Sequence, residues 1–309
     1  IDVTAWSQAK RDEFMIKDNT HFGSWDYDAL ANEWDNLPLT EWGVAVWDTE
    51  LEDVKGLTDE DDVPAAPQEP ITKLGDVWIL GEHRVMCGDS TSKEAVEILM
   101  EGEKADMVFT DPPYGISHSG KGITANGVEG NDFGEIMGDS DVSVAVDALN
   151  LCLKEFSDST LIFWGANYYC QSIPNGYGWL VWDKEREGNT FSGAELAFVN
   201  KGVRLDVFRH MWHGMVKASE HGQKRVHPTQ KPIALAEWCF DNYNDPKTIL
   251  DLFLGSGSTL IAAEKTNRKC YGMELDPKYC DVIVKRWEDF TGKKATREID
   301  DLEVITQAH

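Results

Sequence analysis

The sequence predicts an α/β protein whose sheet is mostly parallel and covered by helices on both faces. From residue 71 onward, short apolar runs alternate with segments of helical periodicity, which is the pattern of β-α-β units. A glycine-rich turn joins one of these runs to a helix within residues 248–266. With 309 residues, of which 41% are hydrophobic, the chain can bury one large core and still carry appendages.

The α/β region begins with a predicted hairpin. VWIL (77–80) and HRVMC (83–87) are strand-like runs on either side of Gly81 and Glu82. A helix over 91–101 follows, with Ser90 or Thr91 as its cap, and then a buried strand over 105–110. The later elements are expected in this order: helix 141–156, strand 160–164, a short helix near 166–172, strands 178–182 and 194–199, helix 232–243, strand 248–252, helix 258–266, strand 269–274 and helix 277–290.

The rest of the chain divides by composition. Residues 1–51 are polar and rich in tryptophan, and the spacing in YDALANEWDNL predicts a small helical element. Residues 52–70 are acidic and contain prolines, which indicates a linker. The α/β domain is expected over 71–295, followed by a frayed tail over 296–309. Within the domain, the segment 115–138 carries seven glycines, and it is either a lid that orders on substrate binding or a disordered loop.

The charge distribution bears on the class of partner. A net charge of −26 argues against nucleic acid at first sight. Residues 1–70, however, hold 18 acidic and 4 basic residues, which accounts for −14 of that charge. Residues 201–231 hold 7 basic and 2 acidic residues and are therefore net +5. This segment is either a nucleic-acid contact or a solvated basic loop.

The apolar runs and the cysteines indicate the cellular setting. No run approaches the ~18 consecutive apolar residues of a membrane span, so no membrane partner is expected. The six cysteines form no CxxC pair and read as reduced thiols of a cytoplasm-like compartment. Neither a disulfide framework nor a metal site is expected.

Residues 248–276 have the pattern of a cofactor site. The order is strand, glycine turn, helix, strand and terminal carboxylate. Gly255 and Gly257 allow a tight turn and close approach of a ligand, and the following helix offers backbone N–H groups. Glu274 ends the second strand, where nucleotide-binding folds place an acceptor for ribose hydroxyls. The dinucleotide fingerprint is not matched, because Leu260 stands at its third glycine position.

The run from Asp251 to Thr259 resembles the F-x-G-x-G motif of S-adenosylmethionine-dependent methyltransferases. In the same way, D-P-P-Y at 111–114 resembles the catalytic motif of methyltransferases that act on adenine N6 or cytosine N4. With HPTQKP (227–232) between them, the order resembles the β class of DNA methyltransferases, a circular permutation of the class I methyltransferase fold. The resemblance covers residues 71–292, and it implies that the strands ending at Asp89 and Asp111 open the domain.

The resemblance also assigns roles to residues. For S-adenosylmethionine, it implies contacts from Asp89, Phe253, Gly255, Ser256, Gly257, Glu274 and Lys231. Phe253 is alternatively a core residue, and Lys231 a solvated lysine at a helix start. For DNA, the segment 200–226 stands in the place of the target-recognition region, with Arg204, Arg209, Lys217, Lys224 and Arg225 as candidate contacts. Trp182 and Lys184 are candidates for the wall of the base pocket, although a core tryptophan fits equally.

The D-P-P-Y residues suit methylation of an exocyclic amino group. Its lone pair is delocalised into the ring, so the enzyme must localise and align it. Asp111 can accept one amino hydrogen, and the carbonyl of Pro112, held by the fixed φ angles of Pro112 and Pro113, can accept the other. Tyr114 can stack on a base that has left the duplex.

We therefore expect a methyltransferase acting on N6 of adenine in double-stranded DNA, in the cytoplasm of a bacterial or phage-infected cell. Three alternatives stay open: N4 of cytosine, an RNA or protein-amide substrate, and a non-enzymatic cofactor-binding or DNA-mimicking protein. A homodimer is expected by analogy with the family. The head, IKDNTHFGSWDYDALANEWD, is similar to segments joining ParB-like domains to methyltransferases in phage-type modification enzymes, which implies a longer parent protein.

Overall fold

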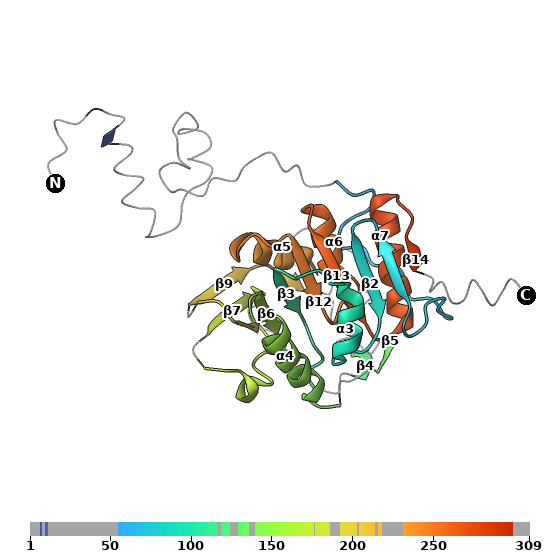
Figure 1. Cartoon of the computed structure of the whole chain (residues 1–309), viewed down its shortest axis with the longest axis horizontal. Coiled ribbons are helices and arrows are strands. Elements are labelled where there is room, and N and C mark those ends of the chain that lie inside the picture. Colours follow the sequence, from blue (N-terminus) through green and yellow to red (C-terminus); the bar gives the residue numbers. More distant parts are fainter. Residues whose placement is uncertain are drawn as a thin grey trace, which may run out of the picture. The chain divides into compact units, whose positions relative to one another are not determined.

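A computed structural model describes residues 7, 10–11, 55–115, 119–123, 129–135, 140–175, 177–185, 192–202, 204–213, 216–217 and 231–298. The chain divides into two compact units, Ile1–Glu52 and Asp53–His309. The helical element predicted for 1–51 lies almost wholly outside the described residues. The second unit holds the α/β domain (Figure 1).

A ten-stranded sheet forms the centre of this unit. Its strand order is β14 (Thr296–Glu298), β1 (Val77–Leu80), β2 (His83–Cys87), β13 (Lys269–Glu274), β12 (Thr248–Asp251), β3 (Met107–Thr110), β6 (Thr160–Trp164), β8 (Ala194–Val199), β7 (Gly178–Asp183) and β9 (Leu205–Arg209). The five strands from β2 to β6 in this order are parallel to one another. The predicted α/β class is confirmed, and β2 and β3 flank the pair β12 and β13, as a permuted order requires.

Helices cover both faces of the sheet (Figure 1). On one face pack α5 (Ile233–Asn242), α6 (Ser258–Lys265) and α7 (Pro277–Thr291), and on the other α3 (Lys93–Met100) and α4 (Ser143–Glu155). Strand β3 is apolar because its side chains are buried on both faces of the sheet. Met107 and Phe109 pack in the core on the side of α5, α6 and α7, whereas Val108 packs in the core on the side of α3 and α4.

Local sequence determines where the helices begin and end. The Asp276 side chain accepts a hydrogen bond from the Lys278 backbone N–H, Pro277 occupies the first turn of α7, and Gly292 ends it at φ +73°. Helix α3 is capped by Ser92 instead of the predicted Ser90 or Thr91. The Ser90 hydroxyl donates to the Leu252 carbonyl, which ties the start of α3 to the residue after β12.

Several segments differ from the expected structure. The predicted loop 115–138 contains an antiparallel hairpin of β4 (Ser119–Ile123) and β5 (Glu129–Glu135). In the predicted tail, β14 pairs with β1, and this polar edge strand carries no apolar periodicity by which it could be recognised. The helix expected near 166–172 is a single 3-10 turn, Cys170–Ser172.

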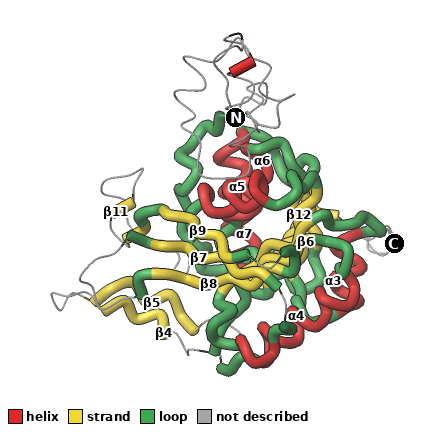
Figure 2. The backbone as a smooth tube through the Cα atoms, turned by 90° about the vertical axis from the view of Figure 1, so that its left-hand side faces the viewer, coloured by secondary structure: helices red, strands yellow, loops and turns green. Residues whose placement is uncertain are grey.

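The basic segment also contains strands. Strand β9 extends the main sheet beside β7, as Figure 2 shows, and a second hairpin joins β10 (Trp212–His213) to β11 (Val216–Lys217). Only Phe208 of β9 is buried, so the strand has little apolar signal in the sequence.

The acidic segment predicted as a linker is bonded to the domain over part of its length. The Leu57 N–H donates to the Phe290 carbonyl (2.8 Å), and Lys265 pairs with Glu60 (2.5 Å). Arg286, which is 2% exposed, donates to the Glu60 carbonyl (2.8 Å). This part of the segment therefore lies against α6 and α7.

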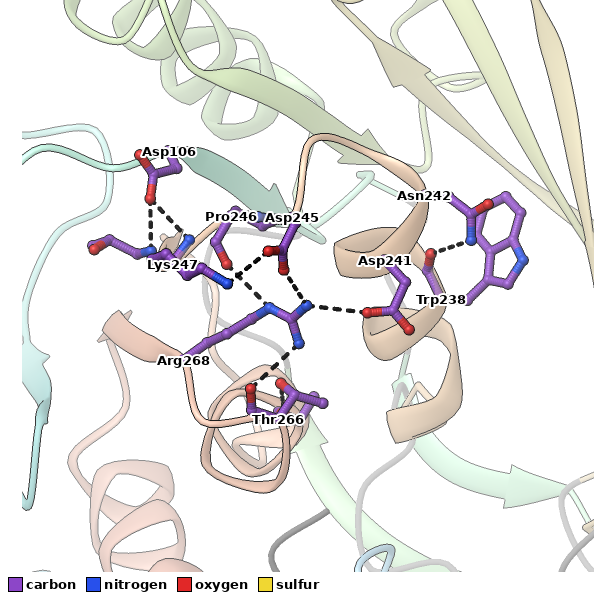
Figure 3. Close-up of polar contacts among 11 residues, drawn as sticks. Asp106, Trp238, Asp241, Asn242, Asp245, Pro246, Lys247, Thr266 and Arg268 are labelled. Carbon is purple, nitrogen blue, oxygen red and sulfur yellow. Dashed lines mark hydrogen bonds and ion pairs between the residues drawn. The ribbon is translucent and has the colours of Figure 1, made fainter. Parts of the chain in front are cut away.

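A buried arginine aligns the amino ends of the central strands (Figure 3). Arg268, which precedes β13, donates to the Asp241 (3.0 Å) and Asp245 (2.7 Å) carboxylates and to the Pro246 carbonyl (3.0 Å). At the start of β12, the Asp106 carboxylate accepts from the backbone N–H groups of Lys247 and Thr248 at 2.9 Å each. Because these contacts set the relative positions of β3, β12 and β13, the carboxyl ends of these strands also lie side by side.

Candidate active site

The carboxyl ends of the parallel strands bring most of the predicted site residues to one edge of the sheet. Asp89 follows β2, Glu274 ends β13, Phe253 follows β12 and Asp111 follows β3. The chain crosses from β12 to β13 in one direction along the sheet and from β3 to β6 in the other. The point where the direction reverses, between β12 and β3, is where open α/β sheets bind ligands.

The glycine turn and Glu274 form one hydrogen-bonded unit. Gly255 and Gly257 have φ angles of +56° and +86°, which other residues adopt only with strain. The Gly255 N–H donates to Oε2 of Glu274, and the Asp276 N–H donates to Oε1, each at 2.9 Å. Burial raises the pKa of Glu274 to about 7, although these two bonds oppose the shift. Since a carboxylate offers about four acceptor positions, these bonds leave Glu274 able to accept from a ribose hydroxyl as well.

Asp89 lies next to this unit. The Gly88 N–H donates to the Glu274 carbonyl (3.0 Å), which joins the two strand ends. Oδ1 of the exposed Asp89 accepts from the backbone N–H and the hydroxyl of Thr91. Two carboxylates on adjacent strand ends, beside a glycine turn, fit the hydroxyl and amino groups of an adenosine moiety.

The structure places two predicted cofactor residues differently. Ser256 is 4% exposed, and its carbonyl and hydroxyl accept from Arg286 at 2.8 and 3.4 Å. Its side chain therefore belongs to the interior. Phe253 is half-buried against the core that contains α3 and α4, so the residue combines a packing role with a position at the turn.

A buried carboxyl joins the D-P-P-Y segment to the glycine turn. Asp251 accepts from the Thr110 hydroxyl (2.8 Å), the Thr259 hydroxyl (2.6 Å) and the Phe253 N–H (3.1 Å). Burial raises its pKa to about 6. Because Thr110 directly precedes Asp111, this contact fixes the D-P-P-Y segment relative to the glycine turn.

Asp111 is bonded through both carboxylate oxygens. The Tyr114 hydroxyl donates to Oδ1, and Lys231 Nζ lies 2.8 Å from Oδ2. The same ammonium lies 2.7 Å from Oε2 of Glu195. The side chain of Lys231 is 11% exposed, so the alternative of a solvated lysine at a helix start is wrong, while its contact with the cofactor stays a prediction. The start of α5 faces the end of β3 here, and sequence spacing does not reveal which strand end a helix start faces.

Burial and ion pairing oppose each other in this cluster. Burial raises the pKa of Asp111, and the Lys231 ammonium offsets only part of that shift. Burial would also raise the pKa of Glu195, but Lys231 and Lys184 outweigh it and lower that pKa to about 2. Burial disfavours the charged form of Lys231, yet the two carboxylates raise its pKa well above the ordinary value.

Two stacked tyrosines lie beside the cluster of Asp111, Lys231 and Glu195. The rings of Tyr114 and Tyr168 lie 5.0 Å apart at an interplanar angle of 10°. Tyr168 is 48% exposed, whereas Tyr114 is half-buried. Gly165, at φ +69°, lies so close to Tyr114 that any side chain there would overlap the ring. Pro112 is buried and Pro113 half-buried beside them.

The predicted DNA contacts are only partly within the described residues. Trp182 is 1% exposed and its Nε1 donates to the His210 carbonyl (3.1 Å), so its assignment to the base pocket is wrong and the core alternative holds. The side chains of Arg204 and Arg209 are both 65% exposed and pair with Asp206 and Asp183. Lys217 lies on β11. Lys224 and Arg225 lie outside the described residues, as does HPTQ of HPTQKP.

Sequence reasoning missed Glu195 and Tyr168. Lys184, a candidate for the wall of the base pocket, pairs with Glu195. Glu195 is the one charged residue in the strand AELAFV, and this position near the strand start was an available signal. Tyr168 had no comparable signal, because its stacking depends on the turn after β6.

Among the described helices, none has the length and apolar character needed to cross a membrane.

Comparison with known proteins agrees with this geometry. The family model of the DNA methylases (N6_N4_Mtase) matches residues 179–285, which include Glu195, Lys231 and the glycine turn. The chain is 24% identical over 244 residues to the type II methyltransferase M.HinfI of Haemophilus influenzae, covering 65% of this chain and 68% of that one. It is 23% identical over 231 residues to the type II methyltransferase M2.DpnII of Streptococcus pneumoniae, covering 61% and 84%.

Among solved structures, the M1.HpyAVI–S-adenosylmethionine complex has a TM-score of 0.39 and 17% identity, covering 65% of this chain and 97% of that one. The fold assignment itself comes from the sheet order described above. Over residues 179–285 the chain is thus similar to the N6/N4 DNA methylases, and over most of its α/β domain it is similar to the two type II methyltransferases.

Proposed function

We propose that this protein transfers a methyl group from S-adenosylmethionine to the N6 amino group of adenine in double-stranded DNA. One observation carries the proposal: Asp111 is tied through Thr110 and Asp251 to the glycine turn that Glu274 holds. An amino-group acceptor and a nucleotide-type cofactor site therefore stand at one switch point of the sheet.

The residues of this chain would hold the cofactor at the ends of β2, β12 and β13. Glu274 would accept the ribose hydroxyls and Asp89 the adenine amino group, while the turn at Gly255 and Gly257 would pass beside the methionine portion. When bound, the cofactor supplies a methyl group already activated on a sulfonium. The protein then needs no covalent intermediate of its own.

Asp111 would orient the amino group of the target base. Its carboxylate accepts one amino hydrogen and the Pro112 carbonyl accepts the other, so the nitrogen lone pair points toward the methyl group. As the nitrogen forms its new bond, it must lose a proton, and Asp111 is the nearest acceptor. Its raised pKa suits that role.

The stacked tyrosines would receive the base after it leaves the duplex. One face of Tyr114 is covered by Tyr168, so a base inserts between the two rings or stacks on the exposed outer ring. Arg204 and Arg209, with Lys217, Lys224 and Arg225, would contact phosphates or base edges. The motif D-P-P-Y favours adenine within the family, and N4 of cytosine is the second candidate.

The test is incubation of genomic DNA with methyl-labelled S-adenosylmethionine, followed by mass spectrometry of the nucleosides. We expect labelled N6-methyladenine. Labelled N4-methylcytosine would overturn the base assignment and leave the reaction class intact. Absence of label from DNA, with RNA or protein labelled in parallel reactions, would overturn the DNA substrate. No label in any of them would overturn the enzyme assignment.

Cofactor affinity should rise as the pH increases through about 7. This follows from the pKa of Glu274, because below that pH one carboxyl oxygen carries a proton and no longer accepts from a ribose hydroxyl. Calorimetry between pH 6 and pH 8.5 measures the effect. The ligand's own α-amino group also titrates in this range. The readout is therefore the difference between the native protein and Glu274→Gln, which should lack the rise. Parallel curves for the two proteins would contradict the role of Glu274.

A further inference from the structure

Four charged side chains from four separate elements form an alternating chain beside the D-P-P-Y segment. Asp111 follows β3, Lys231 precedes α5, Glu195 lies on β8 and Lys184 follows β7. Lys231 bridges Asp111 (2.8 Å) and Glu195 (2.7 Å), and Lys184 pairs with the other oxygen of Glu195. All four side chains are between 11% and 26% exposed.

We propose that Glu195 is a positioning residue of this site, which holds the Lys231 ammonium against Asp111 and thereby fixes the orientation and charge of the catalytic carboxylate. The inference rests on the proposed function, in which Asp111 meets the target amino group. It adds a residue from a strand that contains neither the D-P-P-Y nor the glycine-turn motif.

The hydrogen bonds of Lys231 support this role. An ammonium has three N–H donors, and Lys231 has three acceptors within reach: Asp111, Glu195 and, at 3.4 Å, the Tyr114 hydroxyl. A lysine has a long flexible stem, so one carboxylate alone would leave its Nζ atom mobile. With Glu195 as second anion and Tyr114 as third acceptor, the ammonium is held at one place on Oδ2 of Asp111.

The charges of the cluster support it as well. Two carboxylates and two ammonium groups sum to zero. Without Glu195, the cluster would carry a net positive charge next to an amino group that itself gains positive charge during methyl transfer. Glu195 thus offsets the cations that Asp111 alone cannot neutralise.

The surroundings of Asp111 determine how its titration should respond. The groups that face it from the packed elements are Tyr114, Tyr169, Lys231, Glu195 and Asp251. Lys231 is the cation among these groups and lowers the pKa of Asp111, whereas Glu195 raises it. In the Lys231→Gln background, where Glu195 acts on Asp111 directly, loss of Glu195 should therefore move the titration of Asp111 to lower pH. With Lys231 present, release of its ammonium opposes that shift. Loss of Lys231 should move it to higher pH.

The experiment compares the native protein with Glu195→Gln, Lys231→Gln and the double variant. The titration of Asp111 is followed by NMR of ¹³C-labelled aspartate, assigned with Asp111→Asn, and methyl transfer is measured as a function of pH. In Glu195→Gln we expect kcat to fall roughly 10- to 100-fold, with KM for S-adenosylmethionine unchanged. In the Lys231→Gln background, Glu195→Gln should lower kcat by a much smaller factor, because Glu195 acts through Lys231.

Glu237→Gln is the matched control. Glu237 pairs at 2.7 Å with Lys265, whose side chain is 11% exposed like that of Lys231, but this pair lies on α5 and α6 away from Asp111. It should change the thermal unfolding temperature without moving the Asp111 titration. If Glu195→Gln does not fold, Glu195→Asp, which keeps the charge at shorter reach, should titrate close to the native protein and retain most of kcat.

Two results would overturn the proposal. One is an Asp111 titration that loss of Glu195 moves equally with and without Lys231. The other is an equal loss of kcat with and without Lys231. Failure of the proposed function is distinguishable, since it appears as a native protein that methylates no DNA, while the NMR titration still reports whether Glu195 and Lys231 control Asp111.

Discussion

Replacing Asp111 with alanine should abolish methyl transfer and leave the fold and cofactor binding intact. The change removes the acceptor for the amino hydrogen and for the departing proton, and we expect the rate to fall by at least about 10³-fold. The cofactor contacts assigned to Glu274 and Asp89 come from other strand ends, so affinity for S-adenosylmethionine should change little. Single-turnover transfer and calorimetry measure the two quantities separately.

Asp111→Asn is the matched variant, because it keeps the size of the side chain and removes its charge. It should lose most of the activity as well, since an amide does not take up the proton. Should Asp111→Ala lose cofactor binding together with activity, Asp111 would be a structural residue of the β3 end, and the catalytic assignment would fail.

Replacing Gly165 with alanine should inactivate the protein through Tyr114. The added Cβ would overlap the Tyr114 ring, and the φ angle of +69° adds backbone strain. Displacement of the ring would separate the Tyr114 hydroxyl from Asp111 and disturb the stack with Tyr168. We expect a loss of about 100-fold in kcat and of about 1–3 kcal/mol in the free energy of unfolding.

Gly102→Ala separates the effect of backbone strain from the effect of overlap with the Tyr114 ring. Gly102 also has a positive φ, +82°, but an added Cβ there would meet nothing within 4 Å. This variant should lose some stability and keep its activity. In contrast, Gly165→Ala combined with Tyr114→Ala should regain stability, because the overlap is relieved, without regaining activity. Full activity of Gly165→Ala would show that the position of Tyr114 is unimportant.

The glycine turn and its acidic partner could be predicted from sequence because their signals are local. The strand–glycine turn–helix pattern needs only neighbouring residues, and the structure places Gly255, Gly257 and Glu274 in one hydrogen-bonded unit. The side-chain direction of Ser256 could not be predicted, because it depends on Arg286, which is 30 residues away in α7.

The surroundings of Asp111 could be predicted only in part. D-P-P-Y marks the end of β3, but the partners of Asp111 come from residues 195 and 231. Strand β8 is antiparallel to β6, so its start, not its end, lies at the active edge of the sheet. The alternating burial of β7 likewise turns Trp182 into the core, although its sequence position at that edge suggested a pocket wall.

The resemblance to a known family implied the permuted order of the central strands. By itself, the sequence determined the α/β class and the two motif-bearing strand ends. These follow from apolar periodicity, glycine turns and chain order, which are properties of consecutive residues. Only the tertiary structure decided that Lys231 pairs with Asp111, that Glu195 and Lys184 complete the charge chain, and that Tyr168 covers Tyr114. The physical reason is that such contacts depend on which strands are neighbours and which face each side chain takes, and a pattern along the chain does not contain that information.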